Sequence, residues 1–197
     1  QWQGDEEKFL SSVEKSLDIC FGLLPIGLFA GALLIRLLLP VAFPVQYTDG
    51  SLGASASDLF MILLVGWCLT LLATPSYTAL QAGKNPWIFT TFIVAVVVFA
   101  PILGFLLISS LANSTTNGLY GAAIASTLSS AFLLFASIHL AKLWVIIRHR
   151  SVELISTICL ASITCFGFIS ESSLIFSGVL LFLFTPRGWR AMMTTDS

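Results

Sequence analysis

Three basic residues, Arg36, His139 and Lys142, lie inside or at the ends of long apolar segments and are the candidates for binding chemistry. A charged side chain inside a hydrocarbon core costs at least about 2.5 kcal/mol, so it usually faces a cavity, a ligand or a partner. Arginine offers up to five donors in a planar fork that suits phosphate, and lysine offers a compact positive charge. We therefore predict a substrate-binding role for these three residues.

A second interpretation of these cations is snorkelling, in which a long side chain extends to the membrane surface. Arg36 lies near one end of its apolar segment, with Asp58 at the start of the next, and both interpretations stay open. Lys142 follows His139 by one helical turn on the same face, but it lies close to the end of its segment. For Lys142, snorkelling is therefore the default.

Catalytic and metal-binding patterns are not found in the sequence. His139 and His149 are its two histidines, and neither belongs to an HExxH or phosphatase-like arrangement. No GxSxG motif and no Gly-rich phosphate loop after a strand occurs. The four cysteines fall in or at the ends of apolar runs without the spacing of a metal site: Cys20, Cys68, Cys159 and Cys165. We expect no enzyme activity, no catalytic residue, no metal ion and no cofactor.

The composition is that of a membrane protein. Of 197 residues, 57% are hydrophobic and 10% are charged, whereas a soluble domain carries about 25% charged residues. The formal net charge of −1 argues against nucleic-acid binding, because no basic patch is present to displace counterions from phosphate. We expect an all-α polytopic bundle of about six transmembrane helices in contact with membrane lipids.

The stretch from Thr74 to Asn85 orients the chain. It separates two apolar runs, Leu59–Ala73 and Trp87–Ala112, each near the length that crosses a bilayer. Its turn-forming residues predict a tight turn at the membrane surface, and Lys84 marks that surface as cytoplasmic by the positive-inside tendency. The polar loops around residues 47–58 and 113–118 contain no Lys or Arg and are expected on the outer side.

Three regions follow from this topology. Residues 1–18 form an amphipathic cytoplasmic lead-in helix, which we expect to lie in the membrane interface, with a soluble connector as the alternative. Residues 19–145 form a four-span bundle. Its predicted spans are Ile19–Leu39, Leu59–Leu80, Trp87–Leu111 and Leu119–Val145.

Residues 146–197 are expected to form two further short spans and a cytoplasmic tail. The spans are predicted over Val152–Ser170 and Ser173–Pro186. One long helix is the alternative, but it would place Arg187 and Arg190 outside, against the positive-inside tendency. With six spans, both chain termini lie in the cytoplasm.

Small residues in the fourth span predict close helix packing. They form two stripes at four-residue spacing, one beginning at Gly118 and the other at Gly121. The stripes comprise Gly118, Ala122, Ser126 and Ser130, and Gly121, Ala125 and Ser129.

The order of these motifs resembles the C-terminal half of Wzx-type polysaccharide flippases, in the multidrug/oligosaccharidyl-lipid/polysaccharide exporter superfamily. The resemblance rests on PSYTALQAGK at 75–84, a long apolar span, GLYGAAIAS at 118–126, and a charged lead-in helix before LLPIGLFAG at 23–31. It covers residues 5–150, and beyond that it rests on hydropathy alone.

The resemblance implies one lobe of a two-lobe transporter that flips a lipid-linked oligosaccharide across the bacterial inner membrane by alternating access. Its partner would be the missing N-terminal lobe of the same protein, in line with a chain that begins at Gln1 and lacks a basic leader. Arg36 would meet the lipid pyrophosphate, by position and not by a matching motif. Two alternatives remain: a self-contained six-helix substrate-binding subunit of an uptake system, and a structural membrane protein.

Overall fold

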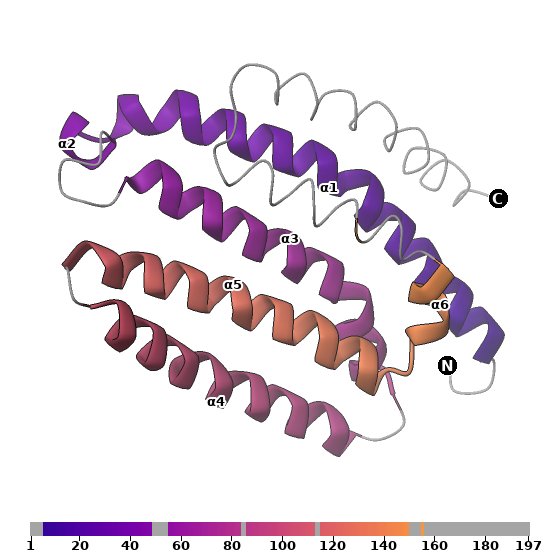
Figure 1. Ribbon diagram of the computed structural model, residues 1–197. Coiled ribbons are helices and arrows are strands. Elements are labelled where there is room, and N and C mark those ends of the chain that lie inside the picture. The colour runs from indigo at the N-terminus through magenta and orange to yellow at the C-terminus, as the bar shows by residue number, and fades with distance from the viewer. Residues whose placement is uncertain (1–5, 49–54, 84–85, 113–114, 150–154, 156–197) are drawn as a thin grey trace.

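The computed structural model describes residues 6–48, 55–83, 86–112, 115–149 and 155 (Figure 1). These residues are almost entirely helical and contain no strand, which confirms the all-α helical bundle. The helices are α1 (Glu6–Ala42), α2 (Val45–Thr48), α3 (Ala56–Gln81), α4 (Pro86–Leu111), α5 (Thr115–Leu140) and α6 (Trp144–His149). The two short spans expected after Val152 lie outside the described residues.

Among the described residues, four helices are long and apolar enough to cross a membrane. The candidate spans are Lys8–Ala42, Ala56–Gln81, Trp87–Leu111 and Gly118–Leu140. Each exceeds the length of about 20 residues that a hydrocarbon core requires. The described part of the chain therefore has the character of a polytopic membrane protein.

The four long helices lie side by side in the order α1, α3, α5, α4 (Figure 1). Helix α5 lies between α3 and α4, although α3 and α4 are consecutive in the chain. The interface between α3 and α5 therefore joins segments distant in sequence, and it carries the polar contacts described below.

Helix α1 unites the lead-in segment and the first span, with no break at residue 18. Its 37 residues correspond to about 55 Å, well beyond a hydrocarbon core of about 30 Å. Its first turns lie beside α6 (Figure 1). Val13 and Leu17 are buried there, in one cluster with Leu143 and Ile147. The apolar face expected in the membrane interface therefore packs largely against protein, although Leu10 remains exposed.

Helix α3 passes through Thr74 and Pro75, so the turn expected from Thr74 begins only after Gln81. Proline lacks the N–H that would bond to the Leu71 carbonyl oxygen, a loss that membrane helices tolerate. The Thr74 hydroxyl donates to the Thr70 carbonyl oxygen at 3.1 Å, and that of Thr78 lies 2.9 Å from the Pro75 carbonyl oxygen. Packing also favours the helix, because Pro75 is buried.

Both ends of α5 differ from the predicted fourth span. The helix begins at Thr115, within the expected loop, and ends at Leu140 instead of near Val145. Lys142 has a φ of 56°, the left-handed conformation that reverses a chain after a helix. Its N–H donates to the His139 carbonyl oxygen at 3.1 Å, and the Leu143 N–H donates to the Ile138 carbonyl oxygen at 3.1 Å. These bonds form a Schellman motif.

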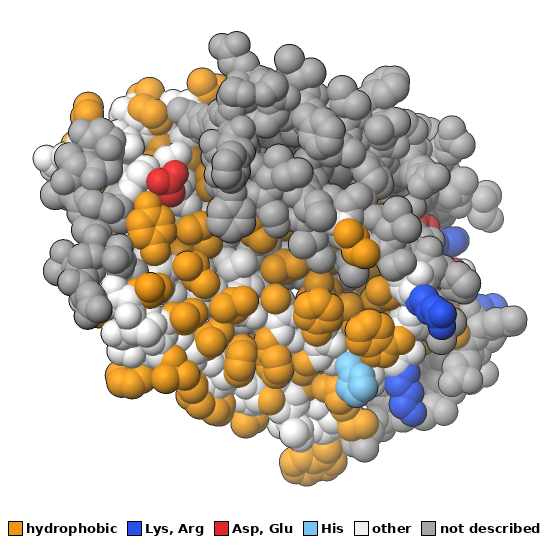
Figure 2. Space-filling model, in the orientation of Figure 1, with side chains coloured by type: hydrophobic (Ala, Val, Ile, Leu, Met, Phe, Trp, Pro, Cys, Tyr) orange, Lys and Arg blue, Asp and Glu red, His pale blue; other side chains and the backbone are white. Residues whose placement is uncertain are grey.

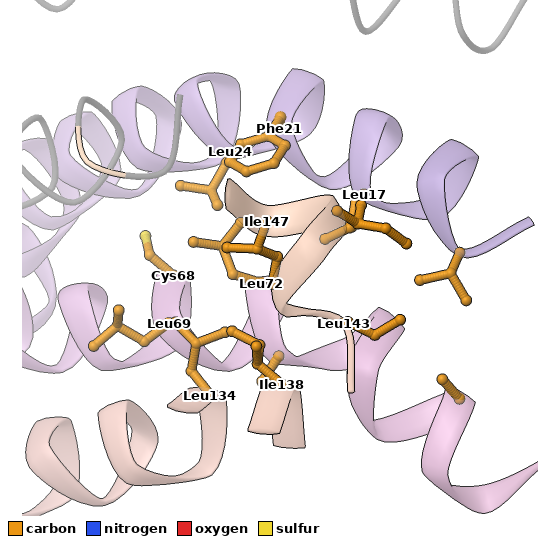
Figure 3. Close-up of a cluster of buried hydrophobic side chains, with 14 of the residues drawn as sticks. Leu17, Phe21, Leu24, Cys68, Leu69, Leu72, Leu134, Ile138, Leu143 and Ile147 are labelled. Atoms are coloured by element: carbon orange, nitrogen blue, oxygen red, sulfur yellow. The ribbon is translucent and has the colours of Figure 1, made fainter. Parts of the chain in front are cut away.

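Helix α6 packs the residues after this motif into the core. Leu143, Ile146 and Ile147 are buried with side chains of α1, α3 and α5. Figure 3 shows Ile147 between Leu24 of α1 and Leu72 of α3. Because a straight extension of α5 would leave these apolar groups away from α1, the burial favours the reversal at Lys142.

Hydroxyl contacts join α3 to α5 along their length. The Thr127 hydroxyl donates to the Ile62 carbonyl oxygen at 2.9 Å, and that of Tyr120 donates to Asp58 Oδ2 at 3.2 Å. The Thr70 hydroxyl lies within 3.1 Å of Ser130 Oγ. In a hydrocarbon environment such bonds help to fix the position of one helix against another.

Replacing Thr127 with valine is expected to destabilise the α3–α5 pairing by about 1 kcal/mol, because the Ile62 carbonyl oxygen loses a donor from α5. The measurement is the thermal unfolding midpoint of the purified chain in detergent. Thr74→Val is the matched control, since the Thr74 hydroxyl bonds within its own helix. Equal midpoints for the two variants would contradict a stabilising role for the Thr127 contact.

Candidate functional site

The three predicted cations do not form one site. Gly27 lies against Trp67, and Gly31 lies against Leu64, so α1 and α3 run antiparallel. This register places the backbone of Arg36 beside the first turns of α3. Asp58 lies in those turns and accepts a hydrogen bond from Tyr120, so Arg36 and Tyr120 are at the same end of the bundle. From Tyr120 to His139, α5 extends about 28 Å at about 1.5 Å per residue. Arg36 and His139 therefore belong to opposite ends of the bundle.

His139 and Lys142 are neighbours at the α6 end, and both side chains are exposed. Lys142 does not continue the helical face of His139, because it lies in the turn after α5. The indole N–H of Trp144 donates to His139 Nδ1 at 3.2 Å. Trp144 thereby joins the site, although the sequence motifs did not indicate it.

Of the small residues, the stripe that begins at Gly121 makes the close helix contact. Gly121 and Ala125 are buried, and a Cβ built on Gly121 would lie 2.8 Å from the Leu107 carbonyl oxygen of α4. Gly118 is half-buried, while Ala122 and Ser126 of the first stripe are exposed. The expected close packing therefore occurs on one stripe, and the other faces outward.

A group of hydroxyl side chains lies on the outward face shared by α3 and α5. We call it the hydroxyl face; it comprises Thr70, Thr74, Thr78, Ser126 and Ser130. On α3 its members are four residues apart, which keeps them on one side of the helix. The contact between Thr70 and Ser130 joins the α5 members to the first member of the α3 row. Four of the five side chains are exposed, and Ser130 is half-buried.

Trp67 borders the hydroxyl face. It is 47% exposed, and its ring lies against Gly27 of α1. Trp67 and Thr70 are near the middle of α3, so this polar strip reaches the centre of a candidate span. An exposed indole beside hydroxyl groups is a surface on which a sugar ring can stack and form hydrogen bonds.

The outward surface of α4 has a different character. Its exposed side chains include Val94, Val97, Ile102 and Phe105, which suit lipid contact. Figure 2 shows broad apolar surface over α4 and α5, with the histidine and basic side chains at the end near α6. The hydroxyl face is therefore distinguished from the apolar surface by chemistry as well as by position.

Four of the five hydroxyls of the face, those of Thr70, Thr74, Thr78 and Ser130, also have a backbone acceptor in their own helix. The Thr70 hydroxyl lies 2.9 Å from the Gly66 carbonyl oxygen, and the Ser130 hydroxyl donates to the Ser126 carbonyl oxygen at 3.1 Å. Such bonds make hydroxyls tolerable in a membrane helix. They leave the oxygen lone pairs free, so the face can accept hydrogen bonds from a ligand.

In the described part of the chain, no group of three or more histidine, cysteine, aspartate or glutamate residues could hold a metal ion. The surface positions described above offer hydroxyl, indole and basic groups. No family model matches the chain, and no curated protein or solved structure is significantly similar to it.

Proposed function

We propose that this chain is one lobe of a membrane transporter that flips a lipid-linked oligosaccharide across the bacterial inner membrane by alternating access. The other lobe is the N-terminal half of the same protein, and both ends of this chain lie in the cytoplasm. The proposal draws on the resemblance of residues 5–150 to polysaccharide flippases and on the four apolar helices. In this proposal the protein is a transporter and not an enzyme.

The observation that carries the proposal is the hydroxyl face beside Trp67. Hydroxyls and an exposed indole near the middle of a span offer polar contacts that a surface of aliphatic side chains lacks, and they suit a passage for a sugar chain. The lipid part of the substrate would remain against apolar side chains.

Removing two exposed hydroxyls of this face, in Thr74→Val combined with Ser126→Ala, is expected to lower export about tenfold. Both substitutions remove acceptors for sugar hydroxyls and leave apolar groups that the membrane accepts. The assay measures lipid-linked oligosaccharide export by the full-length protein in cells that lack their own exporter, normalised to membrane abundance.

The matched control is Ser109→Ala combined with Ser110→Ala. These two serines are exposed on α4 and bond within their own helix, so export should be unchanged. Full export by the Thr74 and Ser126 variant would remove the hydroxyl face from the passage. No export by the unaltered protein would contradict the transport proposal itself, and saturable capture of a small solute instead would favour the uptake subunit.

A further inference from the structure

Lys142 occupies a backbone position that usually belongs to glycine. It is the residue after α5 in the left-handed conformation of a Schellman motif, with a φ of 56°. A side chain other than glycine or asparagine is strained there, and such strain is often found at functional positions. Glycine would adopt this conformation without strain. The presence of lysine therefore suggests that its side chain has a function, such as binding a ligand.

His139 lies in the last turn of α5, three residues before Lys142, and presents a donor of its own. Its Nδ1 accepts the indole N–H of Trp144 at 3.2 Å, so the neutral imidazole carries its proton on Nε2. That atom can donate a hydrogen bond to an anion. Arg148 follows Trp144 by four residues on the exposed face of α6, whereas Leu143, Ile146 and Ile147 are buried. A third basic group therefore lies on the same side of α6 as the indole.

We propose that His139, Lys142, Trp144 and Arg148 form a binding site for the phosphate headgroup of an anionic phospholipid. Cationic groups at a membrane surface attract anionic lipids, and an exposed tryptophan is common at the level of the headgroups. This site is independent of the proposed transport, and it gives His139 and Lys142 a role other than contact with the transported molecule.

The apolar surface next to the site favours a lipid over a free phosphate. Phe135 lies one turn before His139 on α5 and is 50% exposed, and Leu140 is 39% exposed. A molecule with an anionic head and acyl chains would therefore contact cations and apolar side chains together.

The test titrates dihexanoyl-phosphatidylglycerol into the purified full chain in neutral detergent by calorimetry. Lys142→Gly is expected to weaken binding about fivefold, the loss of one basic contact at a membrane surface. It is also expected to raise the unfolding midpoint by about 2–4 °C, because glycine relieves the strain. Lys142→Asn provides a second neutral residue that adopts the left-handed conformation and should lose affinity similarly.

The matched control is Lys15→Gln, which removes an exposed positive charge from the same end of the bundle and should leave the affinity unchanged. Equal losses in the Lys15 and Lys142 variants would overturn the proposal in favour of diffuse attraction. Unchanged affinity in both Lys142 variants would overturn it as well. Inorganic phosphate that binds as tightly as the phospholipid would show a free-anion site, and equal binding of phosphatidylcholine would exclude selection for anionic lipid.

Discussion

A leucine at position 121 is expected to force α4 and α5 apart. The Cβ of any substituent would lie 2.8 Å from the Leu107 carbonyl oxygen and 3.2 Å from Ile108 Cα, so the obstacle is backbone and not a flexible side chain. Overpacking of this kind costs about 3 kcal/mol. Because α5 also packs against α3, movement of α5 would disturb the centre of the bundle.

The Gly121→Leu variant can be checked by the unfolding midpoint and by the yield of monodisperse protein in detergent. Ala122→Leu is the matched control, since Ala122 is exposed on the adjacent stripe, and it should leave both quantities nearly unchanged. A midpoint for Gly121→Leu equal to that of the control would mean that α4 and α5 are not in close backbone contact.

The bundle could be predicted from sequence because its strongest signals are local. The apolar run from Trp87 to Leu111 has no ionisable residue, and it forms α4 with nearly those bounds. The end of α5 was not predictable in the same way. No glycine or proline marks Lys142, and the reversal there depends on burial of Leu143 and Ile147 against α1, which lies more than a hundred residues earlier.

In the candidate site, too, some residues could be predicted from local sequence, whereas others depend on how distant helices pack. Arg36, His139 and Lys142 stand out in the sequence because charged groups are rare in apolar segments. The hydroxyl face was missed because its residues are common in membrane helices. The four-residue repeat of Thr70, Thr74 and Thr78 was the available signal. Its proximity to Ser130 depends on helix pairing, and the sequence alone does not place α5 next to α3.

Replacing Arg36 with alanine is expected to lower export about 10-fold to 100-fold, the effect of losing a hydrogen bond to a charged group. Arg36 lies within a candidate span, beside the first turns of α3 by the register of α1. A permanent charge within a membrane span is costly unless it meets an anion. The pyrophosphate of a lipid-linked sugar is such an anion, and a guanidinium can bind two of its oxygens together.

Arg36→Lys should retain part of the export, because ammonium keeps the charge but loses the planar fork. Export of lipid-linked oligosaccharide by the full-length protein, normalised to membrane abundance, is measured for both variants. If Arg36 instead extends to the membrane surface, alanine should leave export unchanged and ease insertion, since the charge then contributes little to function. A third possibility is that the arginine serves only to neutralise Asp58. In that case, adding Asp58→Asn to the Arg36→Ala variant should restore export. If Arg36 binds phosphate, the double variant should remain as defective as Arg36→Ala.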